Sequence, residues 1–246
     1  MYTKSCCIFA FLYSQHNQCY PLYMSGLYIH IPFCLKKCNY CNFHFSTRLE
    51  FKTRLIESLG KELELRKNEA ANKPVKTIYL GGGTPSILSE NELDFIFNEI
   101  SENYDISQTA EVTLEANPDD LTPEYLTYLK KKTPVNRLSI GIQSFSDEDL
   151  LLMNRAHSSQ QAENCIKQAQ DTGFNNITID LIYGAPTTTD EIWISNLEKA
   201  ISLDIPHISS YALTVEPKTV FESQIRKGVL PPLDEEKQLQ HFTLLR

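Results

Sequence analysis

Three cysteines in one short stretch are the residues of this 246-residue chain best placed to carry chemistry. Cys34, Cys38 and Cys41 follow the spacing C-x3-C-x2-C, and such thiolates can hold one face of a metal centre while leaving a position open. A zinc ion is one candidate, because His44 would complete a Cys3His set. An iron–sulfur cluster is the other, since a cluster held by three cysteines keeps one iron free for an outside ligand. Structural zinc sites usually join two separated ligand pairs, so a single loop favours the cluster.

A second group of polar residues lies where short β-rich runs end. Glu115 follows the apolar Leu114 and is expected to face the pocket, although it could instead cap a helix or support other pocket residues. Asp180 lies between Ile179 and Leu181, where an unpaired charge is costly, so it needs a partner such as a bound ligand or Arg155. The glycines of Gly81–Gly83 permit close approach of a ligand to the backbone, although a tight turn would use them equally. The run lacks the lysine of a phosphate loop and does not match the G-x-G-x-x-G dinucleotide fingerprint.

These residues require a scaffold in which strands alternate with helices. Strands are predicted at Leu27–Ile31, Thr77–Leu80, Glu111–Ala116, Arg137–Ile142, Ile177–Tyr183 and His207–Leu213. Helices are predicted near Phe51–Asn68, Glu90–Tyr104, Pro123–Lys131, Asp147–Gly173 and Asp190–Leu203, with Ser89 and Thr122 as N-caps. This alternation indicates βαβ units, a parallel sheet and a barrel or partial barrel. The carboxyl ends of its strands would gather the polar residues around one pocket.

The charge balance and the cysteine count narrow the function classes. The chain holds 23 basic and 31 acidic residues, a net charge of −8, and no basic tract longer than Lys130–Lys132, so we expect no nucleic-acid partner. Seven cysteines are an odd number, which argues against a closed disulfide framework. Cys165 stands alone in a helical pattern and is expected to be a small buried residue. These features favour a cytoplasmic protein.

The two ends of the chain differ from its middle. Residues 1–23 contain the apolar run Cys6–Tyr13, which has no small-x-small cleavage site after it and is too short to span a membrane. We expect these residues to be a non-native or disordered leader before Met24, with no stable membrane insertion. The barrel is predicted to occupy residues 24–233. Residues 234–246 begin as a helix without a C-cap and are predicted to start a truncated C-terminal region.

Taken together, the motifs resemble the radical S-adenosylmethionine superfamily, whose C-x3-C-x2-C loop ligates three irons of a [4Fe–4S] cluster. Within it, the chain resembles the oxygen-independent coproporphyrinogen III oxidase group over residues 26–246. The segments that carry this resemblance are Tyr28–Cys34, Gly81–Pro85, Glu115–Pro118, Arg137–Phe145 and Asp180–Gly184. The branch that the chain resembles most is that of the HemW-type heme chaperones.

The resemblance implies an α/β fold, a partial (β/α)6 TIM-like barrel, with a [4Fe–4S] cluster on the three cysteines. It also implies that S-adenosylmethionine chelates the fourth iron through its amino and carboxylate groups. The implied contacts to S-adenosylmethionine are Tyr28, Tyr40, Gly82, Gly83, Thr84, Glu115, Gln143, Arg155, Asp180 and Ala212. Heme or a porphyrin as cargo, an electron donor and a heme-acceptor protein are the further partners that it implies.

Two departures separate this chain from the oxidases that it resembles. Those enzymes carry a further cysteine two residues after the third, where this chain has Phe43. They also have a long amino-terminal arm that helps to build the substrate site, whereas fewer than thirty residues precede the first predicted strand here. Both departures favour a HemW-like heme chaperone. Oxidative decarboxylation of coproporphyrinogen III by a radical enzyme is the alternative, and a zinc-stabilised barrel with an unrelated binding function is the second alternative.

Overall fold

The computed structural model describes residues 8–10, 25–70 and 73–246. The strands are β1 (Ile8–Ala10), β2 (Ser25–Ile31), β3 (Val75–Gly82), β4 (Ile106–Ala116), β5 (Arg137–Gln143), β6 (Ile177–Tyr183) and β7 (His207–Ala212). The α-helices are α1 (Lys52–Arg66), α2 (Glu90–Asn103), α3 (Pro123–Lys132), α4 (Asp147–Leu152), α5 (Ser159–Asp171), α6 (Asp190–Ser202), α7 (Val220–Arg226) and α8 (Glu235–Leu245). Short 3-10 helices lie at Leu49–Phe51, Lys67–Ala70, Pro85–Ile87 and Pro118–Asp120.

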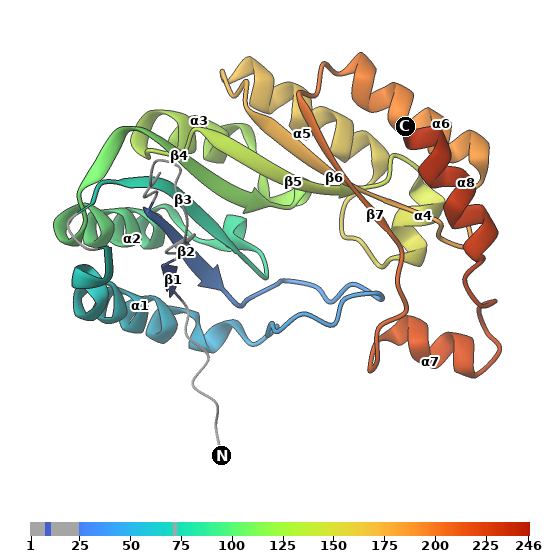
Figure 1. Ribbon diagram of the computed structural model, residues 1–246, viewed down its shortest axis with the longest axis horizontal. Coiled ribbons are helices and arrows are strands. Elements are labelled where there is room, and N and C mark those ends of the chain that lie inside the picture. Colours follow the sequence, from blue (N-terminus) through green and yellow to red (C-terminus); the bar gives the residue numbers. More distant parts are fainter. Residues whose placement is uncertain (1–7, 11–24, 71–72) are drawn as a thin grey trace, which may run out of the picture.

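The strands form one curved sheet in sequence order, with helices packed along its outer side (Figure 1). Strands β2 to β7 are parallel, and β1 pairs antiparallel with β2. Within the described part of the chain, β7 pairs with β6 alone, so the sheet does not close. The prediction of an α/β fold, a partial (β/α)6 barrel, is therefore confirmed. Because the six strands are parallel, their carboxyl ends meet at one rim.

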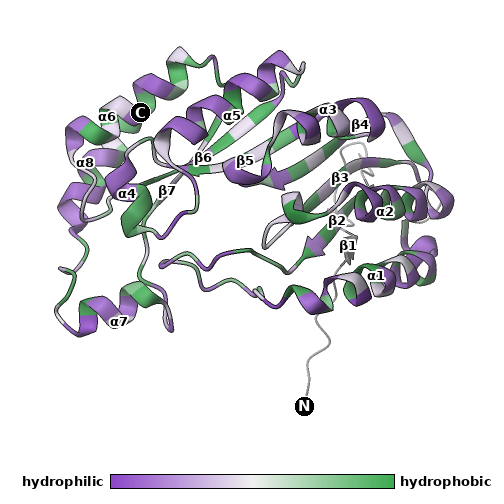
Figure 2. Cartoon of the chain, turned by 180° about the vertical axis from the view of Figure 1, so that it is seen from behind, coloured by the Kyte–Doolittle hydropathy of each residue, from purple (hydrophilic) through white to green (hydrophobic). Residues whose placement is uncertain are grey.

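The core lies between the sheet and the helices. In β2, alternate residues Leu27, Ile29 and Ile31 are buried against it, as the two-residue period of a strand requires. In α2 the buried residues recur at helical spacing: Leu93, Ile96, Phe97 and Ile100. Figure 2 shows the same pattern, with mainly hydrophobic strands and helices that carry hydrophilic residues on their outer faces.

The predicted helix starts follow from side-chain capping. The Ser89 hydroxyl accepts a hydrogen bond from the Glu92 backbone N–H, and the Glu92 carboxylate accepts one from the Ser89 N–H at 2.8 Å. The Thr122 hydroxyl likewise accepts from the Tyr125 N–H, with Pro123 at the first helical position. Both caps satisfy backbone donors that the first helical turn leaves unpaired.

The single helix predicted over Asp147–Gly173 is wrong, because the chain forms two helices there, α4 and α5. Asn154 lies between them with a φ of 58°, in the left-handed region, which ends α4. A new capping box, Ser158 with Gln161, then starts α5. Helix α7 was not predicted either. The predicted start of a helix at residue 234 is present as α8 with Asp234 as its N-cap.

Helix α8 docks on the carboxyl end of β6 through His241, which is fully buried. The Gly184 backbone N–H donates to His241 Nδ1 at 3.1 Å, and Trp193 Nε1 donates to the His241 carbonyl at 2.9 Å. The predicted leader falls mostly outside the described residues, of which only Ile8–Ala10 belong to it, and the domain boundaries stay predictions. None of the described helices has both the length and the apolar composition of a membrane span.

Candidate functional site

A cavity of about 550 Å³ lies at the carboxyl ends of the strands, beside the cysteine loop, which comprises residues 34–41. It is lined by twelve of the thirteen predicted site residues: Cys34, Cys38, Tyr40, Cys41, Gly82, Gly83, Thr84, Glu115, Gln143, Arg155, Asp180 and Ala212. They come from five parallel strands, or the residues directly after them, and from two loops. In Figure 1 the segment after β2 extends away from its strand toward α4 and α7. The structure thus brings these residues together.

Tyr28 is the predicted residue that does not line the cavity. It lies in the middle of β2, and its hydroxyl is 3.2 Å from His30 Nδ1. Its ring stacks on Tyr79 with centroids 5.9 Å apart, and the Tyr79 hydroxyl donates to Glu115 at 2.7 Å. Tyr28 is therefore linked through Tyr79 to Glu115, which does line the cavity.

The cysteine side chains line one wall of the cavity. The Thr84 hydroxyl donates to Cys34 Sγ at 3.3 Å, and Arg155 Nη1 donates to Cys38 Sγ at 3.2 Å. Burial raises the pKa of the Cys34 and Cys41 thiols. Donors directed at sulfur stabilise a thiolate, the form that binds a metal. Among the described residues, no group of three His, Cys, Asp or Glu side chains is arranged to hold a single metal ion, and this applies to the three cysteines with or without His44.

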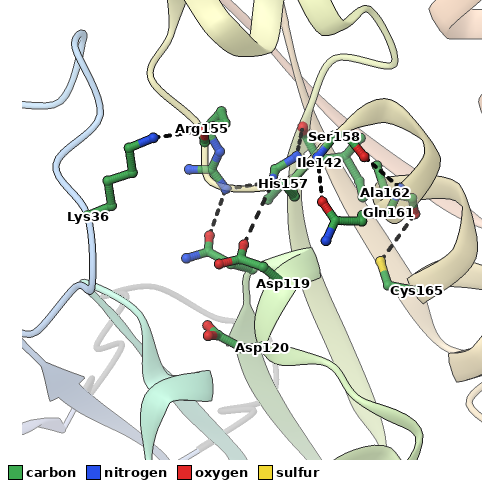
Figure 3. Close-up of polar contacts among 12 residues, drawn as sticks. Lys36, Asp119, Asp120, Ile142, Arg155, His157, Ser158, Gln161, Ala162 and Cys165 are labelled. Atoms are coloured by element: carbon green, nitrogen blue, oxygen red, sulfur yellow. Dashed lines mark hydrogen bonds and ion pairs between the residues drawn. The ribbon is translucent and has the colours of Figure 1, made fainter.

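Arg155 occupies the centre of the polar wall. Its Nη2 donates to Asn117 Oδ1 at 2.7 Å and to the Gly141 carbonyl at 2.8 Å, which fixes the guanidinium against the ends of β4 and β5. Its Nε is buried and has no hydrogen-bond partner among the described residues. Figure 3 shows Arg155 beside His157, whose ring lies 3.7 Å from the Asp119 carboxylate. An unsatisfied buried N–H in a cavity wall fits a site that accepts a polar ligand.

Two carboxylates line the same cavity. Glu115 accepts hydrogen bonds from the Tyr79 hydroxyl and from the Gly82 backbone N–H at 3.1 Å, and burial raises its pKa. Burial, together with the negative charge of Glu115, raises the pKa of Asp180 to about 6. Neither carboxylate forms an ion pair with Arg155 in the described structure, although the Arg155 charge opposes the rise at Asp180. Two carboxylates in one cavity fit a positively charged ligand.

The backbone at two strand ends is tightly constrained by its surroundings. A Cβ on Gly83 would lie 2.6 Å from the Phe33 carbonyl oxygen, so no larger residue fits beside the cysteine loop. Gln143 ends β5 with a φ of 68°, a left-handed conformation that is uncommon outside glycine, and it is nearly buried. Such backbone strain concentrates at functional sites, because only tertiary contacts can hold it.

Other cavity residues were not identified from the sequence. Asn117, Lys36 and Ser139 also line the cavity. Asn117 directly follows β4 within the Glu115–Pro118 motif, and its place after a strand end was a usable signal. Ser139 lies in β5 and pairs in register with Glu115, and a register is not visible in one sequence.

The chain is similar in sequence to known proteins. The model of the radical SAM superfamily matches residues 28–200. The chain is 37% identical over 228 residues to the heme chaperone HemW of Bacillus subtilis, and this alignment covers 90% of this chain and 59% of the relative. It is 39% identical over 220 residues to the heme chaperone HemW of Lactococcus lactis, and this alignment covers 89% of this chain and 56% of the relative.

A solved structure matches the fold as well. Coproporphyrinogen III oxidase (HemN) from Escherichia coli, described as a radical SAM enzyme, aligns with a TM-score of 0.79 at 28% identity. The alignment covers 89% of this chain and 50% of that one. The chain thus spans between half and three fifths of the length of these three proteins.

Proposed function

The chain belongs to the radical SAM superfamily, and from this premise we propose that its cavity holds a [4Fe–4S] cluster with S-adenosylmethionine beside it. The observation that carries the proposal is that Cys34, Cys38 and Cys41 line one cavity together with two carboxylates and with Arg155, whose Nε has no partner among the described residues. S-adenosylmethionine is a cation that carries a carboxylate, so it needs groups of both signs.

Different cavity residues would bind the cluster and the parts of S-adenosylmethionine. The three cysteines would hold three irons and leave the fourth to the amino and carboxylate groups of S-adenosylmethionine. A cluster bound there would supply single electrons at low potential. Gly82, Gly83 and Thr84 would line the methionine end, with Gly83 packed closely against the backbone of Phe33 just before the cysteine loop. Ala212 would contact the adenine.

The polar side chains would orient the ligand. Glu115 and Asp180 would balance its positive charge, and Gln143 and Arg155 would donate hydrogen bonds to its acceptors. Arg155 suits this task, because the Asn117 side chain and the Gly141 carbonyl already hold its guanidinium, while its buried Nε has no hydrogen-bond partner among the described residues. Tyr40 lies in the cysteine loop at the cavity wall and would contact the cofactor from that side.

We further propose that the protein handles heme for transfer to an acceptor protein in the cytoplasm, with an electron donor for the cluster. The relatives at 37% and 39% identity are heme chaperones. The sequence motifs of this chain also resemble those of the HemW-type heme chaperones. Phe43 supports this assignment: it stands where the oxidases that the chain resembles have a further cysteine, and it lines the cavity while 73% exposed. The oxidase alternative is supported by the 28% identical HemN structure.

Anaerobic reconstitution with iron and sulfide tests the cluster. We expect four irons and four sulfides per chain, the composition of the cluster, with zinc absent from the reconstituted protein. Stoichiometric zinc without sulfide would contradict the proposal and support the zinc-stabilised barrel.

Two further assays separate the chaperone from the oxidase. The reduced, cluster-loaded protein is incubated with coproporphyrinogen III and S-adenosylmethionine, and heme binding is titrated in parallel. Heme binding without decarboxylation is the expected result. Formation of protoporphyrinogen IX would establish the oxidase instead.

A further inference from the structure

The cysteine loop is fastened to a segment more than a hundred residues away in sequence. Asn39 Nδ2 donates to the Leu152 carbonyl at 2.8 Å, and the Asn39 N–H donates to the Met153 carbonyl at 3.1 Å. In the opposite direction, Asn154 Nδ2 donates to the Lys37 carbonyl at 2.8 Å. The two asparagines therefore form a reciprocal pair, which we call the asparagine clamp.

A fourth bond supports the clamp. Lys36 Nζ donates to the Arg155 carbonyl at 3.1 Å, and Figure 3 shows the Lys36 side chain extending across to the Arg155 backbone. On its other side, the Asn39 carbonyl accepts from the Phe221 N–H at 3.0 Å at the start of α7. Since Asn39 follows Cys38 and lies two residues before Cys41, these bonds fix the chain between two of the three thiols.

The segment that receives the loop is itself held firmly. Met153 is fully buried in a small core with Ile182, Leu213 and Phe221, against which Tyr40 of the cysteine loop also packs. Asn154 has a φ of 58°, a conformation in which asparagine is one of the favoured residues other than glycine. A strained residue in a packed surrounding persists only where neighbouring contacts determine it.

The same segment also carries Arg155, the next residue along the chain. Its guanidinium contacts Cys38 Sγ at 3.2 Å and Asn117 at 2.7 Å. The break between α4 and α5 therefore holds the backbone of the cysteine loop through Asn154 and one of its sulfurs through Arg155. A shift of this segment would move the loop and the arginine together.

We propose that Asn39 and Asn154 are positioning residues that set the placement of Cys38 and Cys41 for the cluster. This inference rests on the proposed [4Fe–4S] site. Neither asparagine lines the cavity, so both act through the loop rather than through the ligand. Backbone hydrogen bonds outside a metal's ligands commonly orient those ligands and tune the metal centre.

The test compares Asn154→Gly, Asn154→Ala and Asn39→Ala in the cluster-loaded full chain. Glycine accepts a φ of 58° without strain, so Asn154→Gly removes the amide donor and leaves the backbone free to keep its conformation. Iron release to a chelator is timed, and the reduced cluster is examined by electron paramagnetic resonance. We expect each variant to release iron roughly three- to tenfold faster, the effect of one lost hydrogen bond, with an altered resonance spectrum.

Matched variants separate this role from a general loss of stability. Asn103→Ala removes a comparable amide donor, 2.9 Å from the Glu99 carbonyl on α2, away from the loop. Asp204→Gly changes another left-handed residue, with a φ of 51°, after α6. Both should keep the parental spectrum and the parental rate of iron release. Where Asn39→Ala does not fold, Asn154→Gly and Asn39→Asp, which keeps the side-chain volume, carry the test.

The outcomes distinguish failure of the asparagine clamp from failure of the proposed cluster site. Parental iron release and an unchanged spectrum in both Asn154→Gly and Asn39→Ala would overturn the clamp while leaving the proposed cluster intact. An effect in Asn154→Ala that is absent in Asn154→Gly would also overturn it, because backbone strain alone would then explain the change. If the parental chain assembles no cluster, the proposed function itself fails, and the clamp with it.

Discussion

Arg155 and Cys38 lie 117 positions apart in sequence, yet the guanidinium of one donates a hydrogen bond to the sulfur of the other at 3.2 Å. The same guanidinium is held by Asn117 and by the Gly141 carbonyl at the ends of two strands. One side chain therefore ties the cysteine loop to the strand ends that form part of the rest of the cavity. The first two predictions concern the two members of this contact.

Replacing Cys38 by alanine should abolish cluster assembly, because two remaining thiols cannot hold the three irons that the site must anchor. Iron and sulfide contents after anaerobic reconstitution measure the effect. Cys165→Ala is the matched control, since that cysteine is buried in α5 and distant from the cavity, and it should retain full iron content. A complete cluster in Cys38→Ala would refute the ligand assignment.

Replacing Arg155 by lysine should weaken S-adenosylmethionine binding roughly 10- to 100-fold, which corresponds to the loss of a charge-assisted hydrogen-bond pair. Lysine keeps the charge but cannot reach Asn117, Gly141 and a ligand at once. Equilibrium dialysis of S-adenosylmethionine against the cluster-loaded protein measures the change. Arg226→Lys on α7, an exposed arginine paired with Glu222, should bind like the parent. Unchanged affinity in Arg155→Lys would remove Arg155 from the binding residues.

The elements of the fold were predictable because local patterns determine them. Alternating burial specifies β2, and the caps Ser89 and Thr122 mark helix starts directly in the sequence. The break between α4 and α5 was missed because Leu150 to Met153 continue an apolar pattern. A usable signal was nevertheless present, since Ser158 and Gln161 have the spacing of a capping box.

The site was predictable only in part, for a physical reason. Residues at strand ends converge in any parallel barrel, which is why Glu115 and Asp180 could be placed at the cavity from the sequence. The partners of Arg155 depend on the register between β4 and β5 and on the path of a loop, which no local pattern encodes. Tyr28 illustrates the same limit: its ring stacks on Tyr79 of the neighbouring strand, and this contact depends on the register between β2 and β3.

Replacing Gly83 by alanine should disturb the cysteine loop. The new Cβ would lie 2.6 Å from the Phe33 carbonyl oxygen and 2.8 Å from its nitrogen, so backbone next to Cys34 must move. We expect a loss of about 1–3 kcal/mol in the free energy of unfolding, typical of overpacking, together with reduced iron content. Gly228→Ala is the control: its φ of 70° creates strain, but nothing lies near its Cβ. It should lower stability while leaving iron content unchanged.

The pKa of Asp180 predicts a pH dependence of stability. Burial, aided by the charge of Glu115, raises this pKa from 3.8 to about 6 in the folded protein. Between these two values the folded state binds more protons than the unfolded state, so stability falls as the pH rises through this range. Above it the cost is complete, and below it the cost disappears because the carboxyl group is protonated in both states.

Replacing Asp180 by asparagine removes this cost and should therefore stabilise the apoprotein. The gain in the free energy of unfolding should be about 1–2 kcal/mol near neutral pH, reduced from the full linkage value because the carboxylate is only partly buried, and should vanish at about pH 4. Denaturant unfolding at the two pH values measures it.

Ser209→Ala should move the decline in stability to higher pH, because the Ser209 hydrogen bond holds the pKa of Asp180 down. The same Asp180→Asn variant should bind S-adenosylmethionine more weakly, since a buried carboxylate retained at a cost to stability is expected to serve a cationic ligand. Equal stability of parent and variant at both pH values would show that Asp180 is not buried as the structure places it.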